Sequence, residues 1–154
     1  ILLSELNPFR VDFARAMGIE VVDPTGEDLQ EAVRQATDGS GADIVFEVSG
    51  SQAAATIMSE LLCTRGLMLV VAVFGEPPRI NLKSCFMREL RLQAVRCYTH
   101  EDFDDAIDLI ASGQYPFERM ITGEAQVDEL ADVFHEMESG APVMKTLLKI
   151  GGRG

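Results

Sequence analysis

The sequence contains no tryptophan, and it has only two histidines and three cysteines. Cys63, Cys85 and Cys97 lie far apart and form no C-x-x-C pair, which argues against a zinc cluster and predicts reduced thiols in a cytoplasmic protein. His100 lies in the first turn of a predicted helix and His135 lies on a helix beside a run of acids, so we expect both on the surface and neither in a catalytic zinc site. We therefore assign no catalytic residue and no metal ligand to this chain.

Long apolar runs and an excess of positive charge are also missing. No stretch approaches the roughly 18 consecutive apolar residues of a membrane-spanning helix, and nothing resembles a signal peptide. The net charge of −12 repels phosphate backbones and anionic lipids, so we expect neither nucleic acid nor a membrane as a partner. The remaining balance is that of an ordinary soluble protein, because 47% of the 154 residues are apolar and 25% are charged. Such a chain suits one domain with a sizeable core.

Strand and helix patterns alternate along the chain. Short apolar runs predict strands, whereas apolar residues at helical spacing after a capping residue, such as Asn7 or Thr99, predict helices. Thr25 with Asp28 forms an approximate capping box before a further helix. The predicted strands cover residues 1–5, 19–24, 43–50, 66–75, 91–97 and 143–150, and the predicted helices cover 8–17, 25–36, 52–64, 100–112 and 127–138.

This alternation predicts the fold class. Strands separated by helices form βαβ units, so we expect an α/β fold with a doubly wound parallel sheet and helices on both faces. Leu67 to Phe74 are eight consecutive apolar residues, which is typical of a strand covered on both faces. The more polar "RLQAVRC" segment is expected at an edge of the sheet.

One motif of nucleotide-binding sheets is missing. Their first strand leads into a Gly-rich turn, and their second strand ends in an acid that binds the adenosine ribose. Glu5 ends an apolar strand as such an acid does, and its charge would favour NAD over NADP, although a solvated turn residue would look the same. No G-x-G-x-x-G is present, and "DGSGAD" follows a helix, the wrong context for a phosphate loop. We therefore expect the chain to lack the first strand, the Gly-rich turn and the first helix of such a sheet and to begin at its second strand.

Six segments together resemble a known family. These are "SELNPFRVDFARAMG", "TDGSGADIVFEVSG", "RGLMLVVAVFGEPP", "MRELRLQAVRCYTHEDFDDAIDLIASG", "MITGEAQVDELADVFHEMESG" and "MKTLLKI". In order and spacing they resemble the second half of the medium-chain dehydrogenase/reductase family, nearest to its zinc-dependent threonine, sorbitol and butanediol dehydrogenases. The resemblance implies a truncated Rossmann domain over residues 1–142. It also implies a C-terminal strand, 143–154, that would return to a GroES-like domain absent from this chain.

The resemblance also implies which residues bind the coenzyme. Glu5 matches the acid that binds the ribose, and Lys145 matches a basic position that reaches the pyrophosphate. The other matched positions border the adenosine end (Arg10), the adenine (Val48, Ser49, Gly50), the nicotinamide (Ala72, Val73) and the carboxamide (Val95, Arg96, Cys97). Without the resemblance, Arg10, Arg96 and Lys145 would be ordinary surface charges, and the three valines would be core or strand-end residues.

By the same resemblance, the whole enzyme would transfer hydride between NAD and a secondary alcohol of a diol, polyol or hydroxy-amino acid. Zinc would come from the absent domain, and this chain alone would be inactive. The edge strand near 90–97 would pair two copies into a homodimer. Two alternatives stay open: a zinc-independent reductase like the quinone oxidoreductases, and a non-catalytic nucleotide-binding or dimerisation module.

The strand order of this fold class predicts a gap. In the order 3-2-1-4-5-6, the missing first strand lies between the strand of Glu5 and the strand of Val48. The gap would be closed by direct pairing of these two strands, by a partner chain or by residues upstream. For the same reason, we expect the isolated chain to bind NAD weakly or not at all.

Overall fold

The computed structural model describes residues 1–151, and the chain divides into two compact units. One unit contains residues 3–23 together with the described residues from 98 onward, and the other contains residues 24–97. The last three residues of the predicted C-terminal segment, 152–154, lie outside the described residues. None of the helices in the described part of the chain has the length and apolar character needed to cross a membrane.

The first unit begins with strand β1 (Leu2–Ser4), helix α1 (Pro8–Ala16) and strand β2 (Glu20–Val22). The predicted cap of α1 is confirmed, because the Asn7 side chain accepts hydrogen bonds from the main-chain N–H groups of Phe9 and Arg10, and Pro8 takes the first helical position. β1 and β2 form a two-stranded sheet. A small core joins these elements; it consists of Val11, Ala14 and Val21, with Leu3 packed against them.

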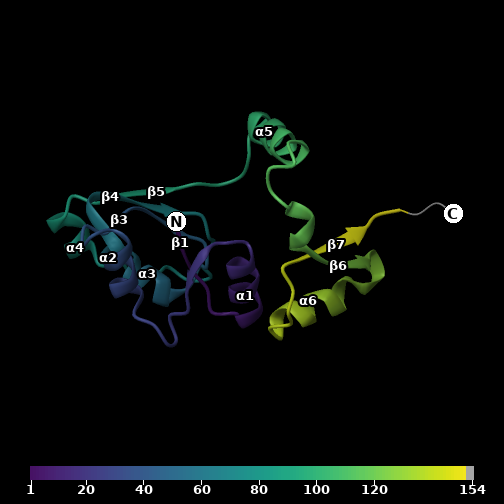
Figure 1. Cartoon of the computed structure of the whole chain (residues 1–154), viewed down its shortest axis with the longest axis horizontal. Coiled ribbons are helices and arrows are strands. Elements are labelled where there is room, and N and C mark those ends of the chain that lie inside the picture. The colour runs from purple at the N-terminus through teal and green to yellow at the C-terminus, as the bar shows by residue number, and fades with distance from the viewer. Residues whose placement is uncertain (152–154) are drawn as a thin grey trace. The chain divides into compact units, whose positions relative to one another are not determined.

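The rest of the first unit contains α5 (His100–Ala111), the 3₁₀ turns Phe117–Met120 and Val127–Glu129, β6 (Ile121–Gln126), α6 (Leu130–Glu138) and β7 (Lys145–Lys149). β6 and β7 pair in parallel, from Ile121 opposite Lys145 to Gln126 opposite Lys149 (Figure 1). The predicted cap of α5 is confirmed as a complete capping box. The Thr99 hydroxyl accepts from the Asp102 N–H, and the Asp102 carboxylate accepts from the Thr99 N–H at 2.6 Å.

The second unit is built on a parallel sheet. It contains α2 (Leu29–Ala36), β3 (Ala42–Glu47), α3 (Gln52–Leu61), β4 (Leu62–Val70), α4 (Leu82–Met87) and β5 (Arg91–Ala94). The strand order is β3-β4-β5, and both pairs are parallel (Figure 1). This confirms the predicted parallel α/β fold. The core of the unit is formed by Met58, Leu62 and Met68, with Val45, Ile80, Cys85 and Leu90 packed against them.

Four local predictions for the second unit need correction. The cap of α2 is Asp28 rather than Thr25, because the Asp28 carboxylate accepts from the N–H groups of Gln30 and Glu31. Helix α3 ends at Leu61 instead of Thr64, since Leu62 adopts extended backbone angles and begins β4. Helix α4 was not predicted. The strand of the apolar run covers Leu62–Val70 instead of residues 66–75, so Val73, which is 94% exposed, lies beyond the end of β4.

β1 pairs with β2 in one unit, and β3 pairs with β4 in the other. β5 lies at the edge of its sheet, as predicted, and all four of its residues are exposed.

Candidate functional site

Three neighbouring strands of the second unit end at one edge of their sheet. Glu47 of β3 lies opposite Val70 of β4, which in turn lies opposite Ala94 of β5. The segments that follow these residues therefore emerge side by side, and Val95 donates from its N–H to the Val70 carbonyl at 3.0 Å. The structure thus brings together the predicted coenzyme segments of this unit: Val48 to Gly50, Ala72 and Val73, and Val95 to Cys97. Ligands of open parallel sheets bind at this carboxyl edge.

The loop after β3 is organised by Glu47. This residue is only 3% exposed, and its Oε1 accepts from the Ser49 N–H at 2.9 Å, the Ser49 hydroxyl at 2.6 Å and the Gly50 N–H at 3.0 Å. Val48 is 65% exposed. The loop therefore directs donor groups of Ser49 and Gly50 at the Glu47 carboxylate and leaves the Val48 side chain exposed. Sequence reasoning did not count Glu47 among the coenzyme-binding residues, because an acid within the apolar "DIVFEVSG" segment looks like the strand acid of the resembled family.

The loop after β4 lies against the loop after β3. The Glu47 carbonyl accepts from the N–H groups of Val71 at 2.9 Å and Ala72 at 3.1 Å. Gly50 has a positive φ of 67°, and a Cβ atom at this position would lie 2.9 Å from the Val73 carbonyl oxygen. Only glycine combines this backbone conformation with so close an approach.

The segment after β5 is the most solvent-exposed of the three. Arg96 and Cys97 are exposed, and no hydrogen bond or ion pair of the Arg96 side chain is present among the described residues. Cys97 is a free cysteine with a positive φ of 61°, a conformation that costs an L-residue other than glycine roughly 1–2 kcal/mol. Val95 is 38% exposed, so it adds apolar surface at the sheet edge.

Glu5 lies in the first unit, directly after β1. Its Oε1 accepts from the N–H groups of Leu6 at 2.8 Å and Asn7 at 2.9 Å, and its Oε2 lies 3.8 Å from Nη1 of Arg10. The Glu5 side chain is 24% exposed. One carboxylate oxygen is thus used by the turn into α1, while the other faces a cation and is open to a further hydroxyl donor. Glu5 and Arg10, which the sequence placed at the adenosine end, are brought together.

Lys145 is the first residue of β7. Its main chain bonds to Thr122: the Lys145 N–H donates to the Thr122 hydroxyl oxygen at 3.3 Å, and the Lys145 carbonyl accepts from that hydroxyl at 3.5 Å. The side chain is exposed. Among residues 1–151 it has no ion-pair partner, so its ammonium is available to an anion.

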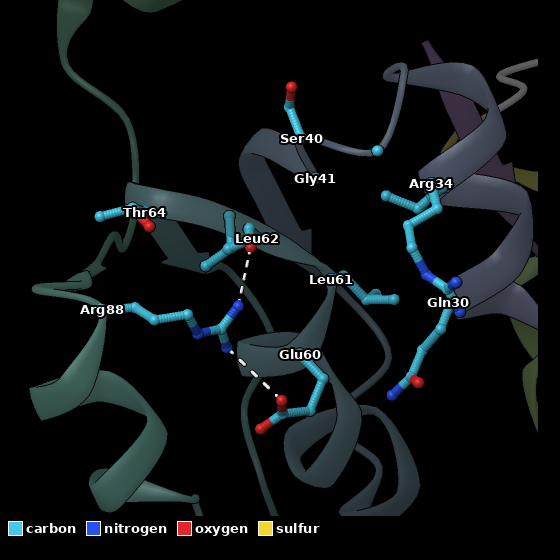
Figure 2. A pocket seen from close by; sticks show the side chains of 11 residues that line it. Gln30, Arg34, Ser40, Gly41, Glu60, Leu61, Leu62, Thr64 and Arg88 are labelled. Atoms are coloured by element: carbon cyan, nitrogen blue, oxygen red, sulfur yellow. Dashed lines mark hydrogen bonds and ion pairs between the residues drawn. The ribbon is translucent and has the colours of Figure 1, made fainter.

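A separate hollow of about 200 Å³ lies near the opposite, amino edge of the β3-β4-β5 sheet (Figure 2). It is lined by α2, the Gly39–Gly41 turn, the end of α3 and the start of β4. Its cations are occupied, because Arg34 pairs with Glu31 at 2.9 Å, and Arg88 bonds to the Leu62 carbonyl, the Ser59 carbonyl and the Ser84 hydroxyl. We therefore assign no ligand to it.

Within residues 1–151, no three His, Cys, Asp or Glu side chains lie together as metal ligands require. The side chains of this described part of the chain therefore do not fit a zinc ion.

Comparisons with known proteins place the chain in a family. Residues 1–112 match the family model described as zinc-binding dehydrogenase. The chain is 38% identical to 2-dehydro-3-deoxy-L-galactonate 5-dehydrogenase of Pseudoalteromonas atlantica over 149 residues, which cover 97% of this chain and 44% of that protein. It is 26% identical to (R,R)-butanediol dehydrogenase of Neisseria gonorrhoeae over 94% of this chain and 42% of that protein. The chain therefore spans less than half the length of these relatives.

A solved structure agrees in fold. The 2R,3R-butanediol dehydrogenase of Bacillus subtilis superposes with a TM-score of 0.86 at 22% identity, over 98% of this chain and 44% of that one. This similarity confirms the Rossmann-type parallel α/β fold. The match of the family model over residues 1–112 shows that the chain belongs to the zinc-binding dehydrogenase family.

Proposed function

We propose that this chain forms the coenzyme-binding part of a dehydrogenase that transfers hydride between NAD and a secondary alcohol. The observation that carries the proposal is the carboxyl edge of the β3-β4-β5 sheet. There, the exposed Val48, Val73 and Val95 follow three adjacent parallel strands of a chain that belongs to a dehydrogenase family. Flat aromatic groups such as adenine and nicotinamide bind against apolar surface of this kind.

In this proposal, polar residues bind the remaining parts of the coenzyme. The open oxygen of Glu5 can accept from a ribose hydroxyl, and the exposed ammonium of Lys145 can pair with a pyrophosphate. In this proposal, Ala72 and Val73 border the nicotinamide, and Arg96 and Cys97 border its carboxamide. Ser49 and Gly50 contribute through the shape of their loop, because their N–H groups already bond to Glu47.

Glu5 also supports a choice between the two nicotinamide coenzymes. Its carboxylate carries a negative charge where the adenosine ribose would bind, and the cation of Arg10 lies 3.8 Å away. A 2′-phosphate at this place would be repelled. We therefore propose NAD rather than NADP.

The substrate class follows from the relatives alone. The curated relatives are named for a deoxy sugar acid and for butanediol, and another, 29% identical, is a sorbitol dehydrogenase of Halalkalibacterium halodurans. We propose a secondary alcohol of a polyol, diol or hydroxy acid as substrate, with any catalytic zinc held by residues outside this chain.

The free state of the three cysteines supports a reducing compartment such as the cytoplasm.

The experiment is a coenzyme and alcohol screen on the protein at its natural length. Reduction of NAD and of NADP is followed by absorbance with butanediol, sorbitol, threonine and sugar-acid substrates. We expect turnover with NAD and at least one polyol or hydroxy acid, and none from the 154-residue chain by itself. Reduction of quinones without any alcohol turnover would overturn the proposal in favour of a reductase, and failure to bind either coenzyme would indicate a non-catalytic module.

A homodimer is part of the same proposal. β5 lies at the edge of its sheet with exposed main-chain groups, and Leu92 and Val95 offer apolar surface there. Two such edges can pair antiparallel about a two-fold axis. Light scattering coupled to size exclusion checks this: Leu92→Lys should shift a dimer to monomers, and a monomeric parent protein would contradict the proposal.

A further inference from the structure

Glu47 is the most buried acid of the carboxyl edge, and nothing in the sequence comparison assigns it a role. Its carboxylate has no cation beside it in the described structure. Instead, it accepts three hydrogen bonds from Ser49 and Gly50, and its second oxygen lies 3.2 Å from the Gly50 nitrogen. A buried carboxylate is stable only when such donors replace its hydration. Here, the donors come entirely from the loop that follows the strand.

The same residue also holds the neighbouring loop. The Glu47 carbonyl accepts from the Val71 and Ala72 N–H groups, so the main-chain pairing continues past the end of β4. The close approach of Gly50 to the Val73 carbonyl fixes the second contact between the loops. One residue therefore braces both loops through different atoms: the side chain sets residues 48–50, and the carbonyl sets residues 71–72.

The network extends to the start of helix α3. The Ser49 hydroxyl, which donates to Glu47, accepts from the Ser51 N–H at 3.1 Å, and the Ser51 hydroxyl caps the helix by accepting from the Ala54 N–H at 3.1 Å. The loop is thus held between a buried acid at one end and a capped helix at the other. Val48 and Ser49 of this loop are both exposed, and Val48, with an exposure of 65%, is its apolar side chain.

We propose that Glu47 is a positioning residue for the adenine end of the coenzyme. By occupying the N–H groups of Ser49 and Gly50, its carboxylate prevents them from binding a phosphate and fixes Val48 in its outward orientation. The inference rests on the proposed NAD-binding function. It goes beyond it because it assigns a role in binding to a residue that is too buried to touch the coenzyme.

The test is Glu47→Gln in the protein at its natural length. The amide can keep one acceptor, but it places an NH₂ group against the Gly50 N–H, so the loop must shift. We expect the dissociation constants of NADH and AMP to rise together by about tenfold, the size of losing one charge-assisted hydrogen bond. Binding of nicotinamide mononucleotide should change less than twofold, because the Glu47 carbonyl and the loop that it holds are untouched. A merely structural role would weaken all three probes alike.

Two further variants accompany Glu47→Gln: one should weaken AMP binding by a smaller factor, and the other is a control. Ser49→Ala removes one donor of the three and should raise the AMP dissociation constant by a smaller factor than Glu47→Gln. Glu60→Gln is the matched control, since Glu60 also accepts hydrogen bonds, from Ser59 and Asn81, but lies at the other end of α3. It should leave the binding of AMP unchanged.

The outcomes separate the two proposals. Unchanged AMP binding in Glu47→Gln, beside normal NADH binding by the parent protein, would overturn the positioning role alone. Equal weakening of AMP and nicotinamide mononucleotide would do the same. Failure of the parent protein to bind NADH would overturn both the proposed function and this inference.

Discussion

Glu5 and Glu47 stand at the carboxyl ends of two strands, one in each compact unit, and their surroundings differ. Each carboxylate accepts hydrogen bonds from N–H groups of the chain that follows it. The Glu5 side chain is 24% exposed and keeps one oxygen open beside Arg10. Glu47 is 3% exposed, and both of its oxygens lie against the Ser49–Gly50 loop. One acid keeps a carboxylate oxygen open to solvent, and the other directs both oxygens at the loop that follows it.

The difference shows what decides the role of an acid at a strand end. Burial removes water from a carboxylate, so every lone pair must find a donor within the protein. Once these donors come from the following loop, the acid is committed to the shape of that loop and cannot bind a ligand. An acid that keeps solvent contact needs fewer internal donors and retains an oxygen for a ribose hydroxyl.

The largest expected effect is on stability. Glu47→Ala leaves the donors of Ser49 and Gly50 without partners in a buried site, and we expect it to lower the free energy of unfolding by about 3 kcal/mol. Glu5→Ala, whose donors can turn to water, should cost less than about 1 kcal/mol. Denaturant unfolding of the two variants measures both values. Equal losses would show that burial does not separate the two acids.

A second prediction concerns the close contact between the loops. Gly50→Ala adds a Cβ atom 2.9 Å from the Val73 carbonyl oxygen at a φ of 67°, and we expect a loss of about 2 kcal/mol in the free energy of unfolding. Gly26→Ala is the control, because Gly26 has open space around its Cβ position and no positive φ. It should be neutral or slightly stabilising. A neutral Gly50→Ala would mean that the loops can move apart without cost.

The open oxygen of Glu5 predicts a change of coenzyme preference. Glu5→Ser removes the charge that would repel a 2′-phosphate and leaves Arg10 unpaired, so the ratio of kcat/KM for NAD to that for NADP should fall by about tenfold or more. Steady-state kinetics of the protein at its natural length measure this ratio. Glu20→Ser, an exposed acid at the start of β2, is the control and should leave the ratio unchanged. An unchanged ratio in Glu5→Ser would remove Glu5 from the coenzyme site.

Much of the fold could be predicted because its signals are local. Asn7 followed by Pro8 defines the start of α1, and Thr99 with Asp102 defines the start of α5; both caps form as predicted. The parallel pairing of β3 with β4 follows from their apolar runs and the helix between them. The edge position of β5 follows from its polar composition.

The errors arise where local signals conflict with packing. "LLCTRGLML" contains an apolar pair that suits the end of a helix, yet Leu62 is buried in the sheet core and therefore begins β4. The "ITGEAQ" segment of β6 is too polar and glycine-containing to read as a strand, and its pairing with β7 supplies what its sequence does not. In the candidate site, the positions of Val48, Val73 and Val95 were predictable from strand ends. The role of Glu47 was not, because it depends on burial and on three donors that only the folded loop brings together.

Asp102 extends the comparison to an exposed carboxylate, for which we expect the smallest effect. It accepts hydrogen bonds from the N–H and the hydroxyl of Thr99 but lies in solvent. The hydrogen bond from the Thr99 N–H, and then that from the Thr99 hydroxyl, hold the pKa of Asp102 below its ordinary value. Because the folded pKa is the lower one, the stabilisation of α5 by this cap is present above about pH 4 and is lost as the pH falls through the folded pKa. Thr99→Ala removes only the smaller cause, so an NMR titration should show the pKa of Asp102 rising only part of the way to its ordinary value, and Ser112→Ala at the far end of the helix should leave it unchanged. A full return to the ordinary value would assign the effect to the hydroxyl. It would then weaken the view that main-chain N–H donors, which also bond to Glu5 and Glu47, contribute most to the stabilisation of these carboxylates.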